Sequence, residues 1–323
     1  MNRYNPLHDL VRRIQMHGGF INAHAHFDRA YTATTRDFEN DNVNAHLFEK
    51  WELVNNFKSN ASEERYYNHI SEAIYNQIKM GVVAGLSFID CDSVSEDRAL
   101  RAALRAKDDW KNKFTLKIAC QTLQGVLDPE PKTWFEKYAH HYDIIGGLPK
   151  KDLHREAEHI DVLMKTAKKN NQRVHVHVDQ LNTPAEKETE LLARKTIEHG
   201  MEGKVTAVHS ISLAAHPKYY RNEVYKIALD AGLSFVSCPT AWIDHRRDDS
   251  YTVNHNAITP IDEMVPLGIT VAIGSDNICD VYKPFSNGDM MTELRFLLEA
   301  THFYDVEKLV EIATVNGKTV LGL

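Results

Sequence analysis

The segment FINAHAH (residues 20–26) ends an apolar run with two histidines, and three later segments repeat this arrangement. They are RVHVHVDQ (173–180), which contains His177, KVTAVHS (204–210), which contains His209, and ITVAIGSD (269–276), which ends in Asp276. Each apolar run has the length and residue types of a short β-strand. Histidines and an acid at the ends of successive strands, in this order, predict a barrel whose rim binds one divalent metal ion.

Apolar runs of this kind occur eight times. They span residues 19–24, 85–90, 114–120, 144–149, 173–178, 204–209, 233–239 and 269–276. The stretches between them, such as 157–170 and 221–232, place apolar residues at i, i+3 and i+4 and close with Gly or Asn, which is typical of helices. Eight strand–helix repeats predict an α/β fold, a (β/α)8 TIM barrel. Active sites in such barrels lie at the carboxyl ends of the strands, where the candidate ligands fall.

The chain length also fits one barrel. With 323 residues, against about 250 for a typical barrel, we expect a single domain over residues 1–323. The segment from about residue 31 to residue 62 departs from the repeat as a long insertion after the first strand, and insertions of this length are usually functional. Its LFEKWELVNNF core (47–57) has helical spacing and aromatic residues, so we expect a partly helical lid over the pocket. The alternative is a surface excursion that packs its own side chains.

Composition narrows the class of protein. The net charge of −7 argues against a nucleic-acid surface. The four cysteines form no CxxC pair, which favours a reduced, cytoplasmic setting over a disulfide framework. No apolar run approaches the roughly 18 residues that a membrane helix needs. We therefore expect a cytoplasmic protein that binds a small-molecule substrate and neither nucleic acid nor a membrane. Whether it forms a homo-oligomer is left open.

The histidines predict most of the metal site. His24 and His26 are two residues apart on a strand, so they share the face that lines the barrel, and both imidazoles can reach one ion. His177 ends the fifth run and is the third candidate ligand. His175 shares its face two residues earlier, and we interpret it as a buried, hydrogen-bonded core histidine. A core role is the alternative for His177 as well.

Asp276 and His209 supply the predicted catalytic groups. Asp276 can bind the metal and also accept a proton from bound water, whose pKa a zinc or iron ion lowers towards neutrality. His209 can hydrogen-bond the attacking hydroxide or polarise the carbonyl or amidine under attack. The alternative for Asp276 is a helix N-cap. The four strand ends taken together favour the metal site.

At this point the sequence resembles the amidohydrolase superfamily, whose pattern is HxH on strand one, His on strands five and six, and Asp on strand eight. GGFINAHAHFDRAYT, IIGGLP, HVDQ, KVTAVHS and LSFVSCP are similar to its cytosine deaminase-like branch. GSDNICDVYKPFSNGDM (274–290) resembles the N-isopropylammelide amidohydrolases of that branch, which remove an alkylamine from a triazine ring. The resemblance covers about residues 20–323. It implies the metal ligands His24, His26, His177 and Asp276, and a hydroxide-orienting role for His209.

Two features depart from the superfamily, and a third concerns the number of metal ions. Cytosine deaminases place a proton-shuttling glutamate three residues after the strand-five histidine, where this chain has Gln180, and an amide cannot donate and accept that proton in turn. Only about 20 residues precede the HxH run and the chain stops at TVLGL, so we expect little or no accessory β-sandwich. Binuclear relatives place a carboxylated lysine on strand four, whereas Lys150 and Lys151 fall past Pro149. We therefore expect one metal ion, Zn²⁺ or Fe²⁺.

Four side chains are candidates for binding the substrate. Gln124 matches a position that contacts the ring in the family, and Gln180 could read a carbonyl or ring NH group. Trp242 and His245, after the seventh run, could cover a planar ring. The alternative for each of the four is a solvated loop residue.

The resemblance implies a metal-dependent amidohydrolase or deaminase that acts on non-peptide C–N bonds. Its expected substrate is a small cyclic amidine, amide or N-heterocycle, such as a pyrimidine or a triazine. One alternative is a hydrolase that displaces a halide or thiol from an azine, for which the missing glutamate matters least. The other is a non-catalytic metal-binding barrel. Release of amine or ammonia, measured against release of halide, separates them.

Overall fold

Eight parallel strands form the centre of the protein. The computed structural model describes residues 5–243 and 258–323. The strands form one sheet in the order β1 to β8, and their bounds are β1 Phe20–Ala25, β2 Val82–Asp90, β3 Thr115–Gln121, β4 Ile144–Gly147, β5 Arg173–Val178, β6 Val205–His209, β7 Ser234–Ser237 and β8 Val271–Ile273. A parallel bridge between Ala25 and Asp276 joins the two edges of the sheet. All eight predicted strands are present, and the predicted (β/α)8 barrel is confirmed.

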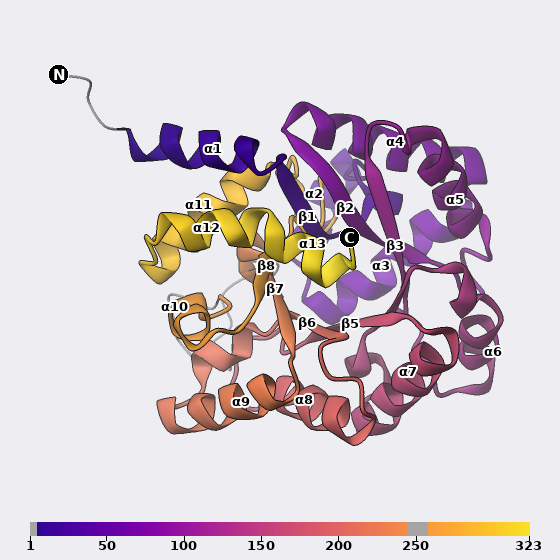
Figure 1. Ribbon diagram of the computed structural model, residues 1–323. Helices are drawn as coiled ribbons and strands as arrows, with labels where there is room; N and C mark the ends of the chain where they lie inside the picture. Colours follow the sequence, from indigo (N-terminus) through magenta and orange to yellow (C-terminus); the bar gives the residue numbers. More distant parts are fainter. Residues whose placement is uncertain (1–4, 244–257) are drawn as a thin grey trace.

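Helices surround the strands (Figure 1). The α-helices are α1 Pro6–Met16, α2 Thr35–Glu39, α3 Leu47–Asn60, α4 Glu63–Lys79, α5 Arg98–Trp110, α6 Pro129–Tyr138, α7 Glu156–Asn170, α8 Glu188–Glu198, α9 Lys218–Asp230, α10 Ile261–Met264, α11 Met290–Thr301, α12 Val306–Ala313 and α13 Val315–Leu321. The 3-10 helices are η1 Phe27–Arg29, η2 Asn42–Asn44, η3 Ala139–His141, η4 Pro149–Asp152, η5 Ile211–Ala215, η6 Pro239–Ile243 and η7 Val265–Leu267. Among the described residues, no helix has both the length and the apolar character needed to cross a membrane.

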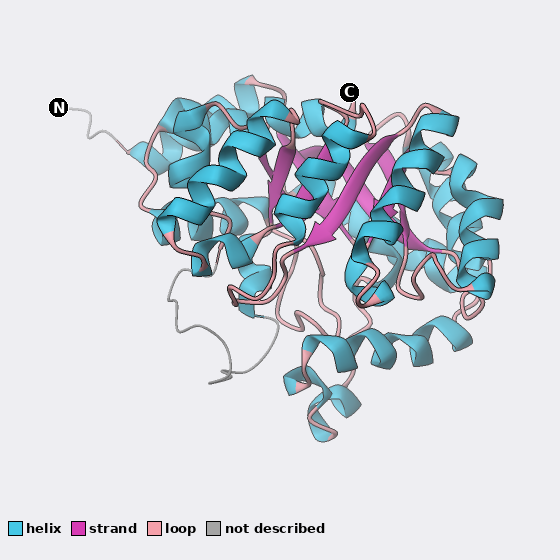
Figure 2. Ribbon diagram, turned by 90° about the horizontal axis from the view of Figure 1, so that it is seen from below, coloured by secondary structure: helices cyan, strands magenta, loops and turns pink. Residues whose placement is uncertain are grey.

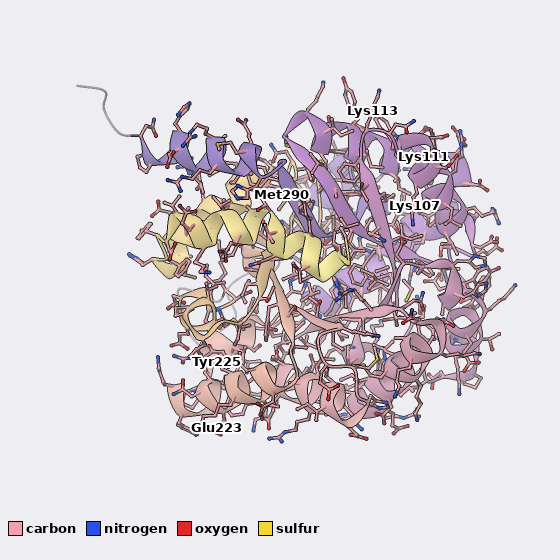
Figure 3. All side chains as sticks on the ribbon, in the orientation of Figure 1. Lys107, Lys111, Lys113, Glu223, Tyr225 and Met290 are labelled. Carbon is pink, nitrogen blue, oxygen red and sulfur yellow. The ribbon has the colours of Figure 1, made fainter. Side chains whose placement is uncertain are left out.

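The helix α5 illustrates how the sequence covers the barrel. One face carries small apolar residues, including Ala99, Ala102 and Ala106, and is buried against the strands. The opposite face carries charged residues in the helical spacing that amphipathic helices show. Lys107, labelled in Figure 3, reaches from α5 to the carboxylate of Asp143 at 2.7 Å. The small buried residues let α5 pack closely on the sheet.

The barrel interior is filled at the end opposite the candidate site. Ile21, Leu86 and Val236 from the strands pack there with Val320 and Leu321 of α13. In Figure 1, α13 lies over the end of the barrel that faces the viewer, and α3 lies behind the barrel. The carboxyl ends of the strands are therefore the part of the barrel left to hold a site.

The segment of residues 31–62, here called the β1 insertion, contains α2, η2 and α3. Its large buried apolar side chains are Leu47, Trp51 and Val54, all on α3. They pack against residues that follow the strands, among them Leu123 after β3 and Leu148 after β4. Figure 2 shows helices set apart from the barrel body, on the side to which the strand arrowheads point. The β1 insertion thus covers the carboxyl ends of the strands.

Candidate metal centre

The strand ends bring the predicted ligands together. His24 on β1, His26 directly after this strand and Asp276 after β8 form one group, and His24, His177 on β5 and His209 on β6 form a second. In each group the nearest ligand atoms all lie within 4.8 Å of one another. Because His24 belongs to both groups, the two form a single cluster. Its side chains are buried, with His24 at 0% and His209 at 5% exposure.

The donor atoms of this cluster fit a metal ion. Oδ1 of Asp276 lies 3.3 Å from Nε2 of His24 and 3.2 Å from Nε2 of His26. Nδ1 of His177 lies 3.0 Å from the carbonyl oxygen of Gly147, which fixes the tautomer and leaves Nε2 buried without a hydrogen-bond partner among the described residues. Both ring nitrogens of His24 likewise have none. Buried polar atoms normally have partners, so imidazole nitrogens that converge without them suit a divalent cation.

Electrostatics keep the cluster in the protonation state that metal ligands need. Burial lowers the pKa of His26 and of His177 well below the usual range, and the charge of Arg29 adds to the effect at His26. Burial also lowers the pKa of His209, to about 4. Burial would raise the pKa of Asp276, but contacts with His24 and His26 outweigh it and hold that pKa well below the usual range. His26, His177 and His209 are thus kept neutral and Asp276 is kept ionised, which matches the requirement for deprotonated ligands.

The backbone is strained at the same strand ends. Asp179, His209 and Asp276 have φ values of 52°, 75° and 57°, in the left-handed region that non-glycine residues rarely adopt. Asp276 is held there by a hydrogen bond from its own N–H to the carbonyl oxygen of His24, at 2.9 Å. Such strain gathers at functional sites because the surrounding structure must impose it.

A buried acidic network holds the loop after β5. The carboxylate of Asp179 accepts hydrogen bonds from the N–H groups of Glu188 and Thr189, and Glu188 accepts one from the N–H of Asp179. Lys150, on η4 after β4, lies 3.2 Å from Glu186 and 3.4 Å from Glu188. Burial and the neighbouring Glu186 raise the pKa of Asp179 to about 6. These contacts use Asp179 to fix the loop that carries Gln180.

A pocket lies beside the cluster and under the β1 insertion. Its lining residues are His26, Arg29, Leu47, Trp51, Gln121, Leu123, Leu148, His177, Gln180, His209, Asp276, Asn277 and Tyr282. Leu47 and Trp51 come from α3, so the β1 insertion supplies an apolar wall. The polar part of the lining comes from the strand ends, from η1 and from the loops that follow the strands. A small, flat, partly polar ring would contact both surfaces.

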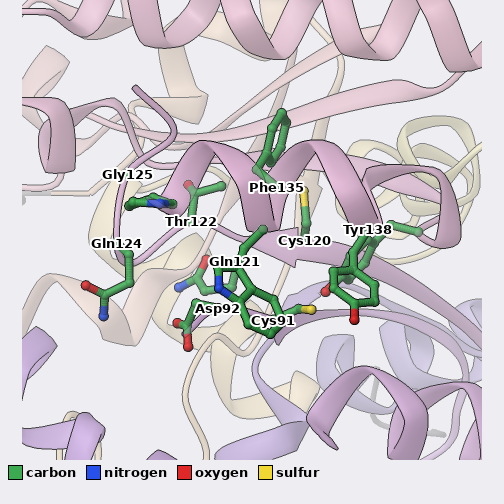
Figure 4. A pocket seen from close by; sticks show the side chains of 12 residues that line it. Cys91, Asp92, Cys120, Gln121, Thr122, Gln124, Gly125, Phe135 and Tyr138 are labelled. Carbon is green, nitrogen blue, oxygen red and sulfur yellow. The ribbon is translucent and has the colours of Figure 1, made fainter. Parts of the chain in front are cut away.

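The predicted substrate-binding residues are placed differently from one another. Gln180 lines the pocket beside the cluster. Gln124 lines a neighbouring pocket with Asp92, Thr122 and Phe135 (Figure 4), and its Nε2 lies 3.4 Å from Oδ1 of Asn55. Trp242 belongs to η6. His245 lies outside the described residues.

Sequence reasoning did not single out four of the lining residues. Arg29 is on η1 just after the HxH run, and Gln121 is the last residue of β3, one position past the predicted strand. A polar residue that directly ends an apolar run is the signal that could have found Gln121. Trp51 was part of the predicted lid core, but no pattern indicated its contact with the pocket. Tyr282 belongs to the loop after β8, and residue spacing in a loop does not predict which side chains line a pocket.

Comparison with known proteins identifies the family. A model of the amidohydrolase family matches residues 96–323. The chain is 44% identical over 252 residues to an uncharacterized protein of Haemophilus influenzae, across 77% of this chain and 91% of that protein. It is 26% identical over 319 residues to N-isopropylammelide isopropyl amidohydrolase of Pseudomonas sp. (strain ADP), across 94% of this chain and 74% of that protein. The chain belongs to the amidohydrolase family.

The fold is also found among solved structures. 5-Methylcytosine deaminase from Klebsiella pneumoniae superposes with a TM-score of 0.85 at 23% identity, across 94% of this chain and 75% of that one. The predicted resemblance to the amidohydrolase superfamily and its cytosine deaminase-like branch is confirmed. The protein is accordingly a hydrolytic enzyme that acts on C–N bonds.

Proposed function

We propose that the protein hydrolyses an exocyclic C–N bond of a small nitrogen heterocycle, such as an aminated pyrimidine or triazine, and releases ammonia or an amine. The observation that supports this most is the buried cluster of four imidazoles and Asp276, beside a pocket walled by Trp51. The relatives named for amidohydrolase and deaminase activities point to the same bond. His24, His26, His177 and Asp276 would hold one Zn²⁺ or Fe²⁺ ion, in a soluble enzyme of the cytoplasm.

When bound, such an ion supplies Lewis acidity and makes water nucleophilic near neutral pH. The chain's own residues then direct protons. Asp276 is ionised and buried at the cluster, so it accepts the proton that the attacking water gives up. The water oxygen bonds to the ring carbon that carries the amine. Asp276 returns the proton to the departing nitrogen as the C–N bond breaks, and the oxygen remains on the ring.

His209 and Gln180 complete the pocket. His209 is neutral because burial lowers its pKa to about 4, so its ring can hydrogen-bond the water or the oxygen that develops from it. Gln180 can read a ring carbonyl or NH group, but its amide cannot carry a proton to a ring nitrogen. The β1 insertion acts as a lid whose Leu47 and Trp51 exclude water from the reacting ring.

A substrate panel tests the proposal. Purified protein loaded with Zn²⁺ or Fe²⁺ is incubated with amino- and alkylaminopyrimidines and triazines, and released ammonia or amine is measured. The matched control is the Asp276→Asn variant loaded in the same way. Turnover by the wild type that falls at least 100-fold in the variant supports the proposal. A fully loaded wild type that turns over no member of the panel contradicts it.

Gln180 favours one second candidate. Displacement of a halide or thiol needs less acid assistance than expulsion of an amine, so a pocket with Gln180 instead of an acid suits such leaving groups. Chloro- and alkylthiotriazines in the same panel decide between the two. Faster release of chloride or thiol than of amine from matched rings would favour this second activity.

A further inference from the structure

Arg29 is a buried cation in the wall of the pocket. It ends η1, three residues after His26, and its side chain is only 6% exposed. It lines the pocket together with His26, His209 and Asp276. The proton-transfer steps proposed above do not use it. A guanidinium placed against the reacting groups calls for a specific role, because burying a charge is costly unless it is paired and hydrogen-bonded.

The guanidinium is only partly satisfied by the protein. Its Nε lies 3.6 Å from Oδ2 of Asp280, beyond hydrogen-bond range, and its carbon lies 5.3 Å from the centre of the Tyr282 ring. Oδ1 of Asp280 accepts hydrogen bonds from the N–H groups of Tyr282 and Lys283 instead. Among the described residues, neither Nε nor Nη1 of Arg29 has a hydrogen-bond partner. The wall of the pocket therefore presents a charged donor.

Gln121 presents the complementary group. It ends β3 and is 6% exposed, and its Oε1 is buried with no hydrogen-bond partner within the described part of the chain. The same pocket is thus lined by a charged N–H donor and by an amide acceptor. A lactam, which joins a ring carbonyl to a ring N–H, offers the acceptor and the donor that these two side chains lack.

We propose that Arg29 donates a hydrogen bond to a ring carbonyl oxygen of the substrate, and that the enzyme thereby selects aminated rings that also carry a lactam, with Gln121 accepting from the lactam N–H. This inference rests on the proposed function and specifies its substrate class. The carbonyl in question is not on the carbon that loses the amine. Arg29 is a specificity-determining residue, and the proton transfers belong to Asp276.

Binding of product-like rings tests the inference apart from turnover. Uracil and pyrimidin-4-one share the carbonyl that hydrolysis leaves, and only uracil has a second one. A matched pair of triazines, with two carbonyls and with one, extends the test to the other ring. Calorimetry on the metal-loaded protein measures both pairs against wild type, Arg29→Met and Arg29→Lys. Arg98→Met is the control, because Arg98 donates to the backbone carbonyls of Ala61 and Val94 and does not line the pocket.

The expected result is that the protein prefers the ring with two carbonyls in one of the two pairs, either the pyrimidines or the triazines. In wild type and in Arg98→Met, the ring with the second carbonyl binds about 10- to 100-fold more tightly, as a hydrogen bond to a charged group allows. Arg29→Met loses this preference, and Arg29→Lys retains part of it. A merely structural role for Arg29 would weaken both rings of a pair equally and leave their ratio unchanged. An unchanged ratio in Arg29→Met therefore overturns the inference, as does a wild type that prefers a pyrimidine carboxylate to the lactam.

The two proposals fail separately. Turnover of the amine panel without a lactam preference would refute the role of Arg29 and leave the hydrolase standing. A preference that depends on Arg29, without turnover of any amine, would refute the proposed reaction and leave the binding role standing. A loaded protein that binds none of these rings would overturn both.

Discussion

Lys58 anchors the β1 insertion, and its removal has a predictable cost. Lys58 lies in the last turn of α3 and is 1% exposed. Its Nζ forms an ion pair with the carboxylate of Asp92 and lies 3.5 Å from Oδ1 of Asp90. At an effective dielectric constant of about 20, a separation of 3.5 Å corresponds to about 5 kcal/mol of gross attraction per pair. Desolvation of the charges offsets much of this, but removing only the lysine leaves two carboxylates buried without their cation. We therefore expect Lys58→Met to lower the free energy of unfolding by about 3–5 kcal/mol.

Urea unfolding monitored by circular dichroism measures this loss. The matched control is Arg101→Met, because Arg101 also pairs with two acids, at Glu63 and Asp97, but is 48% exposed. An exposed pair is worth at most about 1 kcal/mol, so the control should change little. Adding Asp92→Asn to Lys58→Met should recover part of the loss. A loss below about 1 kcal/mol in Lys58→Met would refute the argument that this buried pair anchors α3.

Three further predictions concern the site and the outer surface. Asp276→Asn should retain bound metal, by elemental analysis, yet lose at least 100-fold in kcat; a metal-loaded variant with near wild-type kcat would remove the proton-transfer role. Gln180→Glu should speed amine release from aminopyrimidines relative to chlorinated rings, because it supplies an acid for the ring nitrogen; an unchanged ratio of the two rates would count against that role. Hydrogen bonding to Arg221 lowers the pKa of Glu263 from 4.5 to about 2, so the pair stabilises the folded state fully above pH 4.5 and loses this effect as the pH falls towards 2. Glu263→Gln should cost about 1–2 kcal/mol at pH 7, after allowance for solvent screening, and almost nothing near pH 2; equal losses at both pH values in urea unfolding would contradict this.

The fold was predictable because the periodicity of the sequence is regular. The runs at 173–178 and 204–209 coincide with β5 and β6 to within one residue. The order of candidate ligands on strands one, five, six and eight predicted that their side chains would meet at one end of the barrel, and the structure brings them together there. His175 and His177 share one face of β5, but only His177 lies near the carboxyl end of the strand. His175 contacts the carbonyl oxygen of Val320, and His177 belongs to the cluster.

The rest of the pocket depends on how loops fold back, and no local pattern encodes that. Trp51 reaches the site because α3 packs on Leu123 and Leu148, from loops more than seventy residues away in the chain. Gln124 follows β3, yet it lines the neighbouring pocket, and Gln121 lines both pockets. In the sequence, nothing distinguishes Arg29 from a charged loop residue. Only the structure shows that its side chain is buried and that its Nη1 has no hydrogen-bond partner among the described residues.

The metal content of variants at two histidines tests the central claim most directly. His175 and His177 lie two residues apart on β5, and both are buried, but only His177 belongs to the cluster. After dialysis against metal-free buffer, the wild type and His175→Asn should each retain about one equivalent of Zn²⁺ or Fe²⁺ by elemental analysis. His177→Ala and His177→Gln should retain less than about one tenth of that, since each removes one of only four ligands. Undiminished metal in both His177 variants, with their far-ultraviolet circular dichroism unchanged, would contradict the account.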